Sequence, residues 1–270
     1  MKNKTDILII LIDLLLIICL LSGCEKVVDL KYKGNRSQLI IEGNIVNAPG
    51  PYFVKITKSI PLSETSPYPG IDHALVTISD DAGHREALTS EGDGVYSTHT
   101  LQGVQGRTYT LEVLLDNQTY TAQSTMPELV PFDSIKIGEV TIGGDIDRSL
   151  IPVYQDPSTE GNSYRFVLWI NNKLVNQHLV LNDDVRNGLV NTLRLEINDD
   201  DLKLKPQDQV TINMQCVDPK VGLYYKTLAM IADSGPGGGT TPNNPPNNIS
   251  NGALGLFSAH TAASRSITIP

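Results

Sequence analysis

The sequence predicts a mainly all-β fold: an N-terminal immunoglobulin-like antiparallel β-sandwich followed by a second β-rich domain with one amphipathic helix. Short runs rich in Val, Ile, Thr and Tyr begin near residue 38 and continue almost to the end of the 270-residue chain. Apolar and polar side chains alternate within most of these runs, which is the period of a half-buried strand. Clusters of Gly, Pro, Asn and Asp separate the runs at a spacing typical of sandwiches.

The sandwich is expected over residues 38–127. Its period-2 apolar faces are Leu39/Ile41/Ile45, Val54/Ile56, Ala74/Val76/Ile78 and Tyr109/Leu111/Val113/Leu115. Tyr109 follows Gly106 in the pattern of a tyrosine corner, where the ring packs inward and the hydroxyl ties the preceding loop. A strand at 118–125 closes the domain. Pro127 and Pro131 then bound a stiff link, because proline fixes φ.

The second β-rich domain is expected over residues 132–270. The run 163–170 is apolar on both faces, which predicts a central strand and places Trp169 in the core. Asp218 as N-cap, Pro219 in the first turn and a following apolar stripe predict a helix over about 219–233. Residues 235–248 form a Gly/Pro/Asn loop, and two late strands follow it.

Residues 1–23 have the pattern of an export signal. Ile7–Leu20 is apolar in thirteen of fourteen positions. As a helix this stretch is about 21 Å long, short of the ~30 Å of a membrane core. Leu21-Ser22-Gly23-Cys24 resembles the lipobox read by lipoprotein signal peptidase. We therefore expect cleavage before Cys24, acyl chains on its thiol and an acylated stem over residues 24–37. The alternative is an uncleaved anchor with a chance cysteine.

The net charge and the cysteines argue against nucleic-acid binding, an intramolecular disulfide and a reactive thiol. The formal net charge of −9 disfavours nucleic-acid binding, which needs a basic surface. Cys19 is lost with the signal and Cys24 is acylated, so Cys216 has no partner for an intramolecular disulfide. Cys216 is in phase with Ile212 and Met214 on a strand, which predicts a buried, inert thiol.

The chain shows no motif for catalysis or for a metal. It lacks the Gly-x-Ser-x-Gly, His-Glu-x-x-His, P-loop and Rossmann patterns. The five histidines are isolated in sequence, which favours surface or packing roles; they are His73, His84, His99, His178 and His260. The acidic clusters 145–147, 182–184 and 198–201 do not match the calcium-loop spacing, so solvated turns are favoured over calcium sites. Aromatic residues make up 6% of the chain, which counts against sugar binding. We expect no catalytic residue, no metal site and no cofactor.

Residues 245–259 resemble the ending of a family of Bacteroidetes lipoproteins, the domain of unknown function 4249. Similar motifs precede this ending in order: Leu39–Gly43, Ala74–Gly83, Gly94–Tyr96, Gly106–Leu111 and Met126–Ser134. The resemblance covers essentially the whole mature chain, with departures at Leu256 and in the glycine-rich 235–239. The family has no established activity, so no catalytic residue is carried over. Its members often occur with TonB-dependent outer-membrane transporters, which makes such a transporter a candidate partner by analogy.

Together these observations predict a non-enzymatic binding or accessory lipoprotein of the cell outer membrane. Glu25 and Asp29 are acidic, as surface-export signals of this bacterial group are, but Lys26 interrupts the run. Both the periplasmic face and the cell surface therefore stay open. An envelope structural or adhesive protein is the alternative, and a hydrolase built from scattered carboxylates ranks last.

Ser134 is a candidate site of O-glycosylation. Asp133-Ser134-Ile135 resembles the short signal at which Bacteroidetes attach O-glycans to exported proteins. Such a signal needs an accessible serine, because the glycan is bulky. The simpler interpretation is ordinary turn chemistry before a strand.

Overall fold

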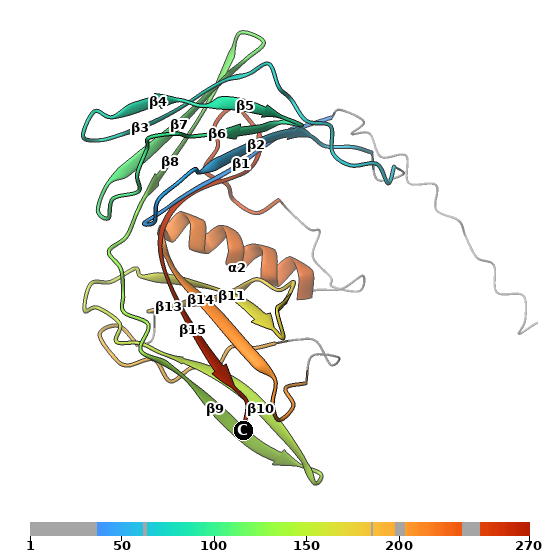
Figure 1. The fold of residues 1–270 in the computed structure, drawn as a ribbon, viewed down its shortest axis with the longest axis vertical. Helices are drawn as coiled ribbons and strands as arrows, with labels where there is room; N and C mark the ends of the chain where they lie inside the picture. Colours follow the sequence, from blue (N-terminus) through green and yellow to red (C-terminus); the bar gives the residue numbers. More distant parts are fainter. Residues whose placement is uncertain (1–36, 62–63, 185, 198–202, 234–243) are drawn as a thin grey trace, which may run out of the picture. The chain divides into compact units, whose positions relative to one another are not determined.

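The computed structural model describes residues 37–61, 64–184, 186–197, 203–233 and 244–270 (Figure 1). These ranges contain fifteen strands and one helix, which confirms the expected mainly β class. The strands of the first half are β1 (Leu39–Val46), β2 (Phe53–Lys58), β3 (Leu75–Asp80), β4 (Arg85–Ala87), β5 (Thr89–Gly92), β6 (Val95–Ser97), β7 (Thr108–Leu115) and β8 (Gln118–Thr125). The later elements are β9 (Ser134–Ile142), β10 (Asp145–Val153), β11 (Ser163–Ile170), β12 (Lys173–Leu174), β13 (Leu179–Asn182), β14 (Gln209–Val217), α2 (Pro219–Asp233) and β15 (Leu254–Thr268).

Strands β1 to β8 form the sandwich that the alternating pattern predicts. β4, β3, β7 and β8 make a four-stranded sheet, while β1, β2, β6 and β5 are neighbours in a different sheet. On β7 the side chains of Tyr109, Leu111 and Val113 are buried and alternate with more exposed neighbours. They share one core with Ile41 of β1 and Ile56 of β2. The period of two thus gives each sheet an apolar face, and the two faces pack on each other.

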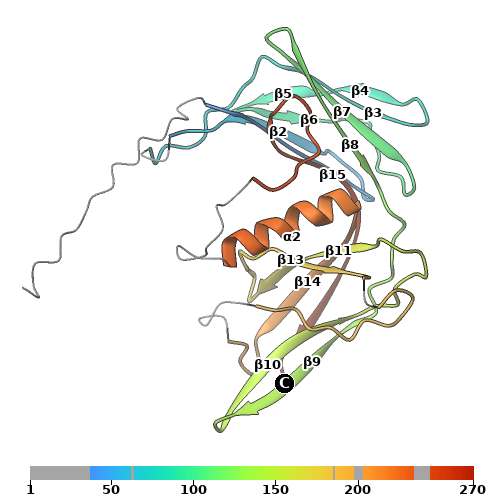
Figure 2. The same cartoon turned by 180° about the vertical axis from the view of Figure 1, so that it is seen from behind.

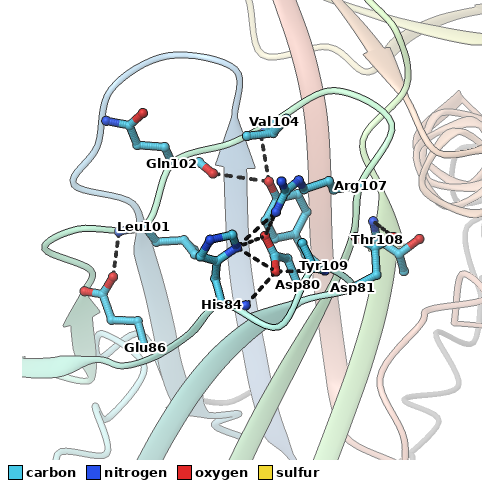
Figure 3. A network of polar contacts seen from close by, with 11 residues as sticks. Asp80, Asp81, His84, Glu86, Leu101, Gln102, Val104, Arg107, Thr108 and Tyr109 are labelled. Carbon is cyan, nitrogen blue, oxygen red and sulfur yellow. Dashed lines mark hydrogen bonds and ion pairs between the residues drawn. The ribbon is translucent and has the colours of Figure 1, made fainter.

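The tyrosine corner is confirmed. The Tyr109 hydroxyl accepts a hydrogen bond from the Val104 N–H at 2.7 Å and donates one to the Gln102 carbonyl at 3.2 Å (Figure 3). The ring is fully buried. One side chain therefore fills the core and fixes the loop that precedes β7.

β15 corrects the expected division into two domains. Its first half, from Leu254 to His260, pairs in parallel with β1, and its second half, from His260 to Thr268, pairs antiparallel with β14. A single sheet in the order β12-β11-β14-β15-β1-β2-β6-β5 results, with β13 also paired to β11 (Figures 1 and 2). Phe257 and Ala259 of β15 belong to the core of the sandwich. The boundary near residue 127 therefore does not separate two independent units.

Gly255 allows β15 to lie beside β1. Its φ is +104°, in the region that favours glycine, and a Cβ at this position would lie 2.0 Å from the Ile41 carbonyl oxygen. The close approach of the two backbones leaves no room for any side chain at this position.

A second core lies between β9, β10, β11 and β14. Tyr164, Phe166 and Leu168 of β11 are buried there beside Ile212 of β14. Trp169 points to the opposite face of β11 and is half-buried, so its expected place in the core is wrong. The sheet face that carries it is not covered to the same depth as the face of Phe166.

α2 has the predicted bounds. The Asp218 carboxylate accepts a hydrogen bond from the Lys220 N–H at 2.9 Å, which caps the helix, and Pro219 occupies the first helical position. Val221 is buried, and Tyr224 and Tyr225 are half-buried on the face toward the sheet. α2 contacts β11, β13 and β15 (Figure 2). No helix in the described part of the chain has the length and apolar character needed to cross a membrane.

The expected loop at 235–248 is described from residue 244 onward. There, the Asn248 side chain accepts a hydrogen bond from the Phe257 N–H at 3.0 Å and donates to the carbonyls of Phe257 and Gln123, at 2.6 and 2.9 Å. This amide therefore ties β8 of one sheet to β15 of the other.

Candidate functional site

The structure places some of the sequence-predicted residues and omits others. Cys24 lies outside the described residues. Ser134 is exposed as the first residue of β9, opposite Val153, so its hydroxyl meets the accessibility that a glycosylation signal needs. Cys216 is a buried free thiol that accepts a hydrogen bond from the Val130 N–H, and burial raises its pKa, as expected of an inert cysteine.

Of the three acidic clusters, 145–147 and 182–184 lie within the described ranges. In the described residues, no group of three or more His, Cys, Asp or Glu side chains is placed to hold a metal ion. Asp183 is buried and accepts hydrogen bonds from the Asn162 N–H and side-chain amide. Asp184 accepts one from the Asn182 side chain. These carboxylates hold the ends of loops, and the cluster 198–201 lies outside the described residues.

A network of charged side chains surrounds the turn between β3 and β4 (Figure 3). The Asp80 carboxylate, whose side chain is 3% exposed, accepts hydrogen bonds from the Ala82 and His84 N–H groups and from the Arg107 guanidinium. Burial alone raises the pKa of Asp80, but these hydrogen bonds outweigh it, and the pKa lies below its ordinary value. The turn is thereby joined to the loop before Tyr109.

Glu86 has a similar role on β4. Its carboxylate accepts hydrogen bonds from the N–H groups of His99, Thr100 and Leu101 (Figure 3 shows the bond from Leu101). Burial raises the pKa of Glu86, but the hydrogen bonds outweigh this effect and leave the pKa below its ordinary value. Both acids therefore bind segments of the chain itself, and the network is a structural one.

A pocket between α2 and the nine-stranded sheet brings together charged, polar and aromatic side chains. We call it the α2 pocket; its volume is about 410 Å³. It is lined by residues of five strands or their flanks and of the helix: Glu42, Gly43, Asn44, Arg165, His178, Gln215, Tyr224, Tyr225, Leu228, Leu256, Ser258 and His260. The pocket therefore has an aromatic and aliphatic wall, from α2 and Leu256, and a polar wall from the sheet.

Arg165 is the charged centre of this polar wall. It alternates along β11 with the buried Tyr164 and Phe166, so it lies on the other face of the strand, toward α2. Its Nη1 donates to Gln215 Oε1 at 2.8 Å, and Gln215 is its register partner on β14. The guanidinium carbon lies 4.2 Å from the centre of the Tyr225 ring, in cation–π geometry.

One donor of Arg165 is left without a partner. Its Nε is buried and has no hydrogen-bond partner among the described residues. A buried donor without an acceptor destabilises a structure by about 1–3 kcal/mol, and more when the group is charged. Such groups are rare in folded proteins and mark places where water or a ligand completes the bonding.

Two histidines lie beside this arginine. His260 is buried, and its Nδ1 lies 3.1 Å from the Ser258 hydroxyl oxygen. Burial, and then the Arg165 charge, lower the pKa of His260 to about 4. The same two causes lower the pKa of His178, whose ring centre is 5.6 Å from that of Tyr225. Both imidazoles are therefore neutral near pH 7.

Sequence reasoning missed this pocket because its members are far apart in the chain. Each histidine is isolated in the sequence, and His178 and His260 line one pocket only because β11, β14 and β15 are neighbours in the fold. Arg165 carried a signal, since it is the single charge in a run of eight residues whose other members, apart from Ser163, are apolar or aromatic. Its partner Gln215 carried none.

Other hollows lie in the described part of the chain, and two of them have a similar volume. One, of about 400 Å³, shares His178 with the α2 pocket and is lined mainly by residues 179–181 and 193–196. The other, of about 450 Å³, lies at Trp169 and Asn213, on the same face of β11 and β14 as Arg165. Neither contains a buried donor like that of Arg165, so the α2 pocket is the candidate functional site.

Comparison with protein families gives a match over residues 25–266 to the family described as Domain of unknown function (DUF4249). No curated protein matches the chain.

Proposed function

The chain belongs to the DUF4249 family, and from this premise we propose that it is a lipid-anchored, non-enzymatic binding protein of the cell outer membrane that holds a small ligand in the α2 pocket. The buried, unpaired Nε of Arg165 carries the proposal. Arg165 lines a pocket whose volume of about 410 Å³ falls in the range of small-molecule sites. The pocket also combines apolar walls with a few fixed polar groups, as ligand sites do.

Binding is favoured over catalysis by the state of the Ser258–His260 pair. A serine within hydrogen-bond reach of a histidine is how many hydrolases activate their nucleophile. A general base works best when its pKa lies near the operating pH, whereas the pKa of His260 is lowered to about 4. Ser258 and His260 are both buried, so the pair serves better to position the polar wall than to attack a substrate.

Attachment to the membrane and the transporter partner rest on the signal pattern of residues 1–24 and on the family resemblance. The full chain, carrying an affinity tag, would be purified from detergent-solubilised outer membranes and its partners identified by mass spectrometry. We expect a TonB-dependent transporter to co-purify with the protein and not with Cys24→Ala. A self-assembled or matrix-bound fraction without a transporter would instead support the envelope structural or adhesive alternative.

Ligand binding in the α2 pocket has its own test. Leu228 lines the pocket from α2, while Leu223 of the same helix is 52% exposed. Leu228→Trp fills the pocket, and Leu223→Trp makes the same change outside it. Native mass spectrometry of the chain purified from its own membranes should show a bound small molecule in the parent protein and in Leu223→Trp, and lose it in Leu228→Trp. A molecule retained equally by both variants, or found in neither variant nor the parent, would refute the assignment of the pocket.

A further inference from the structure

We propose that the ligand of the α2 pocket is a small organic acid whose carboxylate is held by the free Nε edge of the Arg165 guanidinium. This inference rests on the proposed binding function and names the chemical class of its ligand.

The geometry of Arg165 points to a carboxylate. A guanidinium is planar and has five N–H donors in a fixed fork, two of which lie parallel along the edge that contains Nε. The Nη1 end is already bonded to Gln215, while Nε is buried without a partner. Two carboxylate oxygens match the free edge and accept two parallel hydrogen bonds from it.

The neighbours of Arg165 hold the fork in place before any ligand arrives. Tyr225 covers one face of the guanidinium. The Gln215 side chain that accepts from Nη1 is itself fixed, because its amide donates to Asn213 Oδ1 at 3.0 Å. A ligand therefore does not have to order this side chain on binding, which removes one of the usual entropic losses.

The charge of the pocket fits a single negative group. Arg165 is the one Lys or Arg among the described residues that line it, and Glu42 at the exposed rim carries the opposite charge. His178 and His260 add no positive charge near pH 7, since burial lowers the pKa of each. The pocket therefore offers one cation to pair with an anionic group, and Glu42 at the rim disfavours further negative charge. A carboxylate finds its partner in Arg165, whereas a phosphate, with nearly two negative charges at neutral pH, finds no second cation.

The aromatic and aliphatic wall of the α2 pocket indicates which group the carboxylate of the ligand is attached to. Tyr224, Leu228 and Leu256 line the same cavity as Arg165 and contribute ring and aliphatic side chains to it. Tyr224 and Tyr225 pack edge to face, with ring centres 5.4 Å apart, so this wall is ordered. An apolar or aromatic group attached to the carboxylate would bury its surface there.

A matched pair of probes tests the inference: 3-phenylpropanoate and its neutral amide, 3-phenylpropanamide. Each would be titrated into the full chain in detergent and followed by ligand-observed NMR. Hydrogen bonds to a charged group predict that the acid binds roughly tenfold or more tightly than the amide. Arg165→Gln should remove this preference, and Arg165→Lys, which keeps the charge without the planar fork, should leave only part of it. Arg85→Gln changes a 62% exposed arginine of β4 and should preserve the full preference.

The outcomes separate this inference from the proposed function. Equal binding of acid and amide, abolished by Leu228→Trp, would overturn the carboxylate assignment while supporting the pocket as a binding site. A preference for the acid that survives Arg165→Lys in full, or that Arg85→Gln also removes, would overturn the role of Arg165. Absence of binding by both probes would overturn the class of ligand inferred from the two walls. Thermal melts of each variant identify any that fails to fold, and Arg165→Lys then decides in place of Arg165→Gln.

Discussion

His260 should make the stability of the protein fall as the pH is lowered from neutral toward 4. In the folded state its pKa is lowered from the ordinary 6.5 to about 4, first because it is buried and second because Arg165 is close. Below pH 6.5 the unfolded chain therefore binds a proton at this residue that the folded chain does not, and the unfolded state gains relative stability. The stability that neutral His260 preserves is complete above pH 6.5 and is lost as the pH falls through this window.

The loss of unfolding free energy follows from the interval between the pKa of His260 in the unfolded state and in the folded state. Each pH unit between the unfolded and folded pKa is worth about 1.4 kcal/mol, so the loss accumulates to about 3 kcal/mol near pH 4. The pKa of His178 is lowered in the same direction, so His178 adds to the pH dependence of the free energy of unfolding. His260→Asn removes the titrating ring and keeps a polar atom near Ser258, so the difference between parent and variant isolates His260 from His178.

Urea unfolding at half-unit steps from pH 7 to pH 4 would measure the free energy of unfolding, with Trp169, the single tryptophan, as the fluorescent probe. We expect the parent to lose about 3 kcal/mol more than His260→Asn across this range. His73→Asn is the control, because the His73 side chain is 67% exposed, and it should follow the parent. Parallel curves for the parent and His260→Asn would show that His260 is not held neutral by burial, and would refute the reasoning.

Three further predictions concern single residues. Tyr109→Phe should lower the free energy of unfolding by about 1–3 kcal/mol, because the Val104 N–H loses its acceptor; an unchanged urea midpoint would argue against the tyrosine corner as a stabilising contact. Cys24→Ala should abolish incorporation of a labelled fatty acid and move the protein out of the membrane fraction or leave it unprocessed, and a variant that is still labelled would exclude the lipobox. Ser134→Ala should lower the intact mass of the exported protein by the mass of a glycan, whereas a change of one oxygen atom would identify Ser134 as an ordinary turn residue.

Local patterns in the sequence determined the strands, the helix and one buried loop. The period of two on β7 placed Leu111 and Val113 in a core because successive side chains of a strand point to opposite faces. The cap at Asp218 and the proline after it set the start of α2, since these residues satisfy or remove the free N–H groups of a first turn. Tyr109 and Cys216 also took their expected places for the same kind of reason.

The tertiary structure alone decided which strands became neighbours and which side chains met. Nothing in the sequence around Leu254 shows that β15 pairs with β1, more than two hundred residues earlier, since pairing over that distance leaves no local period. The apolar neighbours of Trp169 in the sequence do not show to which face of the strand its side chain points. Trp169 is half-buried because its face of the sheet is covered less deeply than the face of Phe166. His178, His260 and Arg165 are ordinary when taken one by one. The lowered pKa values of His178 and His260 and the unpaired Nε of Arg165 arise because the fold buries these groups, wholly or in part, at one pocket, and burial of that kind is a property of the assembled chain.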